Sequence, residues 1–148
     1  MRIIQFSIRI FSIIVFCLSS NIYADEGATG VVKERIERFK QNKKDLKSMK
    51  SAIEAGDMKE LQVLTARMEK WAKDIPSAFP PHSNPKPSEA SDEIWRTFDD
   101  FKNKAANHRT AVQELMQASQ AGSSTQVLNK ALDRLGASCK SCHKAYKK

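Results

Sequence analysis

The chain has 148 residues, of which 25 are basic and 17 acidic, so its formal net charge at pH 7 is +8. This length is enough for one compact domain. The positive charge is spread over every segment, and no basic block is interleaved with aromatic residues, so the composition argues against a nucleic-acid-binding protein.

The first predicted element is a secretory signal peptide over residues 1–24. Arg2 and Arg9 form its positive start, residues 10–18 are an apolar run, and Ile22-Tyr23-Ala24 is an acceptable cleavage site. An uncleaved membrane anchor is the weaker alternative, because the apolar run is about half of the roughly 20 residues that span a bilayer. We therefore expect an exported protein with no membrane attachment after cleavage.

Cleavage would leave residues 25–148 as one domain and lower the net charge to +6, because Arg2 and Arg9 are lost. It would also remove Cys17. A lipoprotein is not favoured, since Phe16 precedes this cysteine where lipid attachment requires a small residue. The predicted mature chain therefore has two cysteines, both near its C-terminus.

Apolar residues recur three and four positions apart through the rest of the chain, as in amphipathic helices. We expect four helices, whose apolar residues run over 32–53, 61–75, 94–116 and 128–146, with Ser123 or Ser124 starting the fourth. Gly56, Pro76 and Gly122 mark the ends of the first three, and Ser91 is the expected N-cap of the third. Residues 76–91 hold all five prolines and are predicted to be a long ordered connection. This pattern predicts an all-α, antiparallel four-helix bundle.

Cys139, Cys142 and His143 form a C-x-x-C-H motif in the last predicted helix. At about 100° per residue, their side chains share the helix face that carries the apolar stripe. Two thiols on adjacent turns can each bond one vinyl group of a haem, and the following histidine is then held against the iron. We therefore expect one covalently attached haem c, with His143 as the axial iron ligand.

Three other uses of this motif are weaker. A structural zinc site needs four ligands, usually in two pairs, and the other histidines, His82 and His108, stand alone in the sequence. A thioredoxin-like redox pair usually opens a helix after a strand, and no strand is predicted. A disulfide between Cys139 and Cys142 would close a loop of a few residues and stabilise the fold little.

The chain resembles the cytochrome c′ family, the class II c-type cytochromes, over nearly all of residues 25–148. The C-terminal position of C-x-x-C-H carries the resemblance, together with FPPHS at Phe79–Ser83, Ile94-Trp95 followed by Phe101, and CHKAYKK near the end. The resemblance implies a left-handed antiparallel bundle with haem packed between helices near one end. It also implies a bacterial periplasmic location and, as in many members, a homodimer through the first two helices.

The resemblance further implies roles for residues around the haem. VVKERIERFKQ matches the first helix of the family, where an arginine precedes by four residues the side chain over the distal iron face. Arg35 then pairs with a haem propionate and Phe39 is the distal lid. Relatives with methionine in place of Phe39 have six-coordinate, low-spin iron, whereas phenylalanine implies five-coordinate, high-spin iron. Lys147, four residues after His143, matches the basic residue beside the proximal histidine.

These features predict a haem protein that transfers electrons, binds a small diatomic gas such as nitric oxide, or does both, with an unidentified periplasmic redox partner. One alternative is a low-spin, six-coordinate electron carrier, with Met49 or His108 as the second ligand. The other is a gas-protection protein with no carrier role. The sequence supplies no placed acid–base group for cleaving an O–O bond, so a peroxidase is the least favoured reading and no enzymatic activity is expected.

Overall fold

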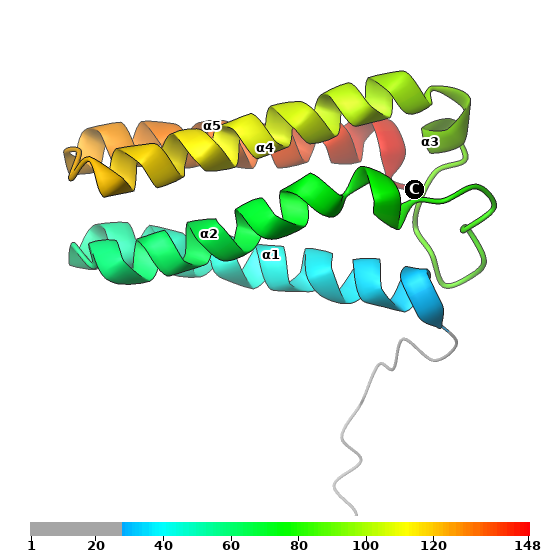
Figure 1. Ribbon diagram of the computed structural model, residues 1–148, viewed down its shortest axis with the longest axis horizontal. Coiled ribbons are helices and arrows are strands. Elements are labelled where there is room, and N and C mark those ends of the chain that lie inside the picture. Colours follow the sequence, from blue (N-terminus) through cyan, green and yellow to red (C-terminus); the bar gives the residue numbers. More distant parts are fainter. Residues whose placement is uncertain (1–27) are drawn as a thin grey trace, which may run out of the picture.

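The computed structural model describes residues 28–148, so the predicted signal peptide lies outside the described residues. The four long helices are α1 (Gly30–Ala55), α2 (Met58–Asp74), α4 (Phe98–Gln120) and α5 (Thr125–Tyr146). They run antiparallel, with α2 packed between α1 and α4, and α5 packed against α4 and α1 (Figure 1). The predicted four-helix bundle is confirmed. No helix of residues 28–148 is long and apolar enough to cross a membrane.

Two short turns join the helices at one end of the bundle. Gly56 and Gly122 lie in these turns with φ of 70° and 61°, a left-handed backbone that glycine adopts without steric strain. Asp57 caps α2, because its carboxylate accepts the Glu60 N–H at 2.9 Å. Both predicted glycine stops are therefore confirmed.

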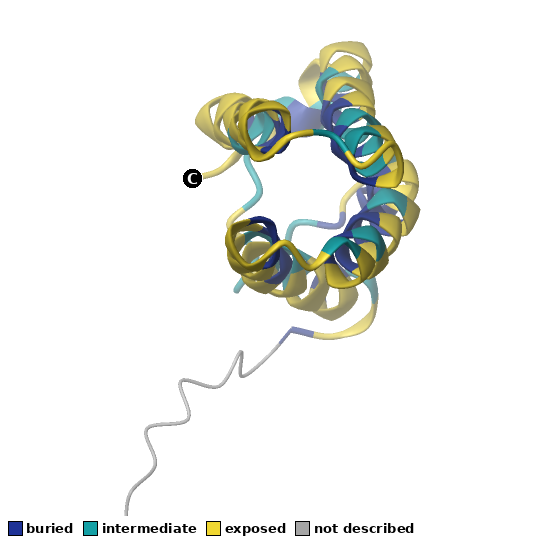
Figure 2. Ribbon diagram, turned by 90° about the vertical axis from the view of Figure 1, so that its left-hand side faces the viewer, coloured by how far each residue is buried: buried dark blue, intermediate teal, exposed yellow. Residues whose placement is uncertain are grey.

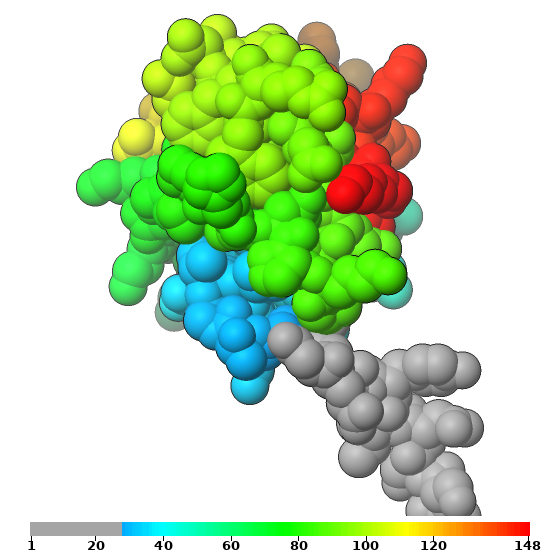
Figure 3. All heavy atoms as spheres, turned by 90° about the vertical axis from the view of Figure 1, so that its right-hand side faces the viewer, coloured from blue at the N-terminus to red at the C-terminus, as the bar shows by residue number. Residues whose placement is uncertain are grey.

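The long connection closes the other end of the bundle. It begins with a short 3-10 helix, η1 (Pro76–Ala78), continues as an irregular loop and ends in the one-turn helix α3 (Glu93–Arg96). The N-cap of α3 is Asp92, one residue after the expected Ser91. The Ser91 hydroxyl still accepts the Glu93 N–H at 3.3 Å. Figure 3 looks onto this end, where atoms of the connection lie between the first turn of α1 and the C-terminal residues.

The third predicted helix is two helices, because Thr97 interrupts it with φ of −123° and ψ of 46°. The Thr97 hydroxyl donates to the Glu93 carbonyl at 2.9 Å and lies 3.0 Å from the Tyr146 hydroxyl. Threonine side chains that bond nearby backbone groups compete with helical geometry. The break coincides with this local bond and with the contact to Tyr146 of α5, neither of which helical periodicity reports.

Buried residues lie along the inner side of the four long helices (Figure 2) and form two clusters along the bundle. The cluster nearer the short turns, here called the aliphatic end, includes Met49, Ile53, Leu61, Leu64, Met68, Val112, Leu115, Leu128 and Leu135. The cluster at the loop end, here called the aromatic end, includes Trp71, Ile75, Phe79, Ile94, Phe101 and Tyr146. The C-x-x-C-H motif lies at the aromatic end, since Cys142 packs against this second cluster.

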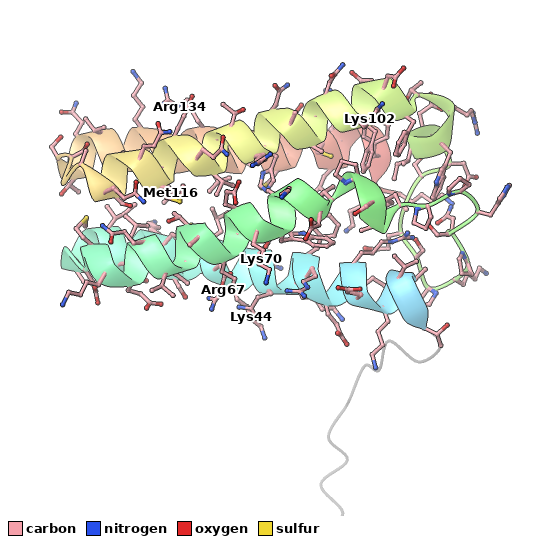
Figure 4. The ribbon with its side chains drawn as sticks, in the orientation of Figure 1. Lys44, Arg67, Lys70, Lys102, Met116 and Arg134 are labelled. Carbon is pink, nitrogen blue, oxygen red and sulfur yellow. The ribbon has the colours of Figure 1, made fainter. Side chains whose placement is uncertain are left out.

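A buried ion pair joins α1 and α2. Arg67 extends from α2 beside α1 (Figure 4) and binds both carboxylate oxygens of Asp45, at 2.7 and 2.9 Å. Gln41 donates a further hydrogen bond to Asp45 at 2.8 Å. The Asp45 side chain is 2% exposed and the Arg67 side chain 48%, so the carboxylate depends on these partners to replace water.

Candidate haem site

The last turns of α5 carry the three residues of the motif on the side that faces the bundle. Cys139 and Cys142 are half-buried, unpaired thiols, and His143 is exposed at the edge of the same face. Burial raises the pKa of both thiols and lowers the pKa of the His143 imidazole, which the positive charge of Lys147 lowers further. Both thiols are therefore protonated and the imidazole is neutral near pH 7.

Phe39 on α1 lies across from this motif. Its ring centroid is 6.2 Å from that of His143, with the rings edge to face. Trp71 and Phe79 lie around the same ring, at centroid distances of 5.6 and 6.4 Å. The structure therefore brings together two residues, Phe39 and His143, that lie about a hundred positions apart in the sequence and that the resemblance places on opposite faces of one haem.

His108 is buried between α4 and α5, on another flank of α5. Its Nδ1 lies 3.0 Å from the Ser138 hydroxyl and 3.8 Å from the Cys139 sulfur. Burial, and to a lesser extent repulsion from His143 when that ring is protonated, lowers the pKa of His108 to about 4, so His108 is neutral near pH 7. The ring is thus an interhelical contact beside the motif. His82, by contrast, is exposed in the loop.

Arg35 is 3% exposed and holds the loop against α1. Its guanidinium donates to the Ala78 carbonyl, to the Ser83 hydroxyl and carbonyl, and to the Ser88 hydroxyl, and it lies 4.5 Å from the centroid of the Phe79 ring. Burial lowers the pKa of Arg35, although guanidinium groups stay charged in proteins. The four bonds use the terminal N–H groups and leave the Nε–H for another acceptor.

The C-terminus holds the same loop from the other side. The Ser91 N–H donates to the Tyr146 carbonyl at 2.9 Å and the Lys148 N–H donates to the Glu89 carbonyl at 2.8 Å. Lys147 pairs with the Glu89 carboxylate at 3.0 Å. The charge of Lys147 acts on His143, and its ammonium is engaged by the loop.

The sequence did not single out Ser83, Ser88 or Trp71 as site residues. Serines in a proline-rich loop read as ordinary turn residues, and nothing in the sequence shows that they bind Arg35. Trp71 lies in the apolar stripe of the second predicted helix, yet its buried indole N–H has no hydrogen-bond partner. No sequence pattern distinguishes this tryptophan from one whose N–H is satisfied.

These residues fit a covalently attached haem. Two unpaired thiols and a neutral imidazole supply the attachment and ligand atoms, and the Phe39 ring faces His143 from α1. The buried Trp71 N–H has no hydrogen-bond acceptor within the protein. Within residues 28–148, no group of three or more His, Cys, Asp or Glu side chains is arranged to hold a metal ion, so the zinc alternative lacks a ligand set there.

Comparisons with known proteins agree with this chemistry. Cytochrome c-556 of Agrobacterium tumefaciens (strain II Chrys) is 39% identical over 79 residues, which cover 51% of this chain and 60% of that protein. Cytochrome c′ of Pararhodospirillum photometricum is 33% identical over 96 residues, which cover 64% of this chain and 73% of that protein. The chain thus spans between about three fifths and three quarters of the length of these relatives.

A solved structure of a cytochrome c′ variant from Alcaligenes xylosoxidans, in complex with nitric oxide, superposes with a TM-score of 0.71. It is 26% identical, and the match covers 80% of this chain and 94% of that one. The family model described as Cytochrome C′ matches residues 30–147. Its members bind covalent haem c and small diatomic ligands, are typically periplasmic and can be dimers. The chain therefore belongs to the cytochrome c′ family, whose members are haem-binding electron carriers and gas-binding proteins and not enzymes.

Proposed function

We propose that this chain is a periplasmic haem protein in which Cys139 and Cys142 attach the haem and His143 is the proximal iron ligand. Each thiol adds its S–H across one vinyl group, so no leaving group is released. The haem supplies a one-electron redox centre and an iron that binds diatomic ligands. The unpaired state of both thiols and their place on the same face as His143 support this assignment.

The observation that carries the proposal is the Phe39 ring opposite His143. With haem held by His143, an aromatic ring on the other side offers no lone pair to the metal. Phe39 therefore leaves the iron five-coordinate and excludes ligands that cannot fit beside a packed ring. A small diatomic such as nitric oxide is the ligand class that this arrangement favours.

The positions of the two other candidate ligands also favour the five-coordinate site. Met49 is fully buried at the aliphatic end, in a cluster that includes neither Phe39 nor Cys142. His108 is held by Ser138 between α4 and α5. Each would have to leave a buried position to reach the iron, so the six-coordinate, low-spin alternative is the less favoured of the two.

Three further expectations come from the resemblance. Arg35 binds a haem propionate through its Nε–H, because its terminal N–H groups already bond Ala78, Ser83 and Ser88. Lys147 lies on the proximal side beside His143. A homodimer would use α1 and α2, where Val63 of α2 is 57% exposed. Electron transfer and gas binding are compatible at one iron, and a gas-protection role without electron transfer is the remaining alternative.

The test is the electronic and resonance Raman spectrum of the purified holoprotein and of three variants. We expect high-spin, five-coordinate iron in the wild type, with ready nitric oxide binding and weak carbon monoxide binding. Phe39→Ala should raise carbon monoxide affinity by about 5- to 150-fold, the equivalent of roughly 1–3 kcal/mol of packing strain. Phe39→Met should shift the iron toward low spin, because it introduces a thioether that can bind the metal.

Phe98→Ala is the matched control. Phe98 is a half-buried phenylalanine of the aromatic end that stacks on Phe101, so its loss should weaken packing with little change in ligand affinity. A wild-type spectrum that is already low-spin would refute the open site, and Met49 and His108 would then be the ligands to replace.

A further inference from the structure

Trp71 has a buried hydrogen-bond donor with no acceptor. The residue is 6% exposed, and its indole Nε1 is one of two buried side-chain nitrogen or oxygen atoms of the described chain that make no hydrogen bond. Buried donors are almost always paired, since an unpaired one loses its bond to water without replacement. An unpaired N–H inside a functional site therefore points to an acceptor that arrives with a ligand.

The second tryptophan of the chain shows that this end of the bundle can satisfy an indole. Trp95 donates its N–H to the carbonyls of Phe79 and Pro80, at 3.1 and 3.0 Å. Both tryptophans belong to or pack against the aromatic end. They differ in that Trp95 has its acceptors in the protein and Trp71 does not.

Trp71 lies on the Phe39 side of the candidate haem site. Its ring packs edge-on against Phe39 at 5.6 Å, and Phe39 meets His143 at 6.2 Å. Arg35, one turn before Phe39, has its terminal N–H groups engaged by the loop and by Ala78. The Trp71 N–H is therefore available to a group that enters beside Phe39.

We propose that the Trp71 N–H donates a hydrogen bond to an oxygen acceptor that the haem brings into this site. The acceptor is a propionate carboxylate or a diatomic ligand bound on the Phe39 side of the iron. Both are oxygen acceptors, and a carboxylate forms the stronger, charge-assisted bond. The inference rests on the proposed function only in placing the haem between Phe39 and His143.

The experiment compares the holoproteins of wild type, Trp71→Phe and Trp95→Phe. Two readouts report the carboxylate: the reduction potential and the propionate bending vibration in the resonance Raman spectrum. Two report the diatomic ligand: the carbon–oxygen stretching frequency and the affinity of the carbon monoxide complex. If the acceptor is the diatomic ligand, loss of one hydrogen bond should change the carbon monoxide affinity by about 2- to 12-fold. Trp71→Phe should alter one pair of readouts and Trp95→Phe neither.

A proton NMR spectrum of the ferrous carbon monoxide complex provides a measurement without substitution. The Trp71 indole proton should resonate downfield and exchange slowly with solvent, as a hydrogen-bonded proton does. The inference is overturned if neither pair of readouts responds to Trp71→Phe, or if that variant does not fold and the wild-type indole proton shows no hydrogen bond. A wild-type protein that binds no carbon monoxide would contradict the proposed open site, whereas the carboxylate readouts would still decide the role of Trp71.

Discussion

His108 should make the protein lose stability in mild acid. In the folded chain burial lowers the pKa of His108 to about 4, against 6.5 for an exposed histidine. Above pH 6.5 both the folded and unfolded states carry a neutral ring. As pH falls below 6.5 the unfolded chain gains a proton that the folded chain does not, so the free energy of unfolding decreases until pH reaches about 4. At 1.36 kcal/mol per pKa unit, the full loss is about 3 kcal/mol.

Most of this loss falls in an accessible window. Between pH 7 and pH 5 the same linkage relation gives about 2 kcal/mol from His108 alone. Glu69 does not contribute there, because its hydrogen bond to Arg109 lowers the pKa of its carboxyl below 4.5 and its stabilisation is lost only in stronger acid. The window therefore lies above the titration of Glu69. Burial also lowers the pKa of His143, so His143 adds to the loss in this window, and only the difference between wild type and a His108 variant isolates His108.

The assay is equilibrium urea unfolding of the holoprotein at pH 7, 6 and 5, followed by circular dichroism. His108→Gln keeps a side chain that can bond Ser138 and cannot take up the proton, so the decrease in unfolding free energy should shrink by about 2 kcal/mol. His82→Gln is the control, since His82 is exposed and its loss should leave the pH dependence unchanged. An equal pH dependence in His108→Gln and wild type would refute the argument.

Two further predictions concern buried charges. Arg35→Met removes four hydrogen bonds to Ala78, Ser83 and Ser88 and should lower the free energy of unfolding by about 3 kcal/mol. Limited proteolysis should cut the loop faster in this variant, and an unchanged cleavage rate would contradict the role of Arg35 in holding the loop. Asp45→Ala should cost about 2 kcal/mol in urea unfolding, less than a fully buried pair because Arg67 can regain water. Glu54→Ala, which breaks an exposed pair with Lys50, should cost less than about 0.5 kcal/mol, and an equal loss in both variants would contradict the burial argument.

The sequence predicted the helices well because their signals are local. Apolar spacing depends on neighbours three and four residues apart, and the stops at Gly56, Pro76 and Gly122 act on the backbone at those positions. The break at Thr97 was missed because Thr97 also contacts Tyr146, 49 residues away, which the local apolar spacing does not report. An interruption imposed by another helix leaves no mark on the periodicity of its own segment.

In the candidate haem site, too, the residues set by local sequence were predicted from spacing and those set by contacts between helices were not. Cys139, Cys142 and His143 are close in sequence, so helical geometry alone places them on one face. Phe39 was found through the resemblance and not through spacing, since its distance from His143 is set by the packing of α1 on α5. Trp71 and Trp95 are the clearest case: both sit in apolar stripes, and only the folded chain shows that one indole N–H is paired and the other is not.

The loop between η1 and α3 makes polar contacts with both α1 and α5, the two helices that flank the candidate haem site. Arg35 of α1 holds the loop at Ser83 and Ser88, while the end of α5 holds it at Glu89 and Ser91. α1 carries Phe39 and α5 carries His143, so the loop is a noncovalent bridge between the two sides of the site. On the Arg35 side the bonds are buried, so opening the bridge there would expose donors and acceptors that have lost their partners. On the α5 side the Lys147–Glu89 pair is exposed. The spacing between Phe39 and His143 is therefore governed by loop contacts that touch neither ring, in addition to the packing of the rings themselves.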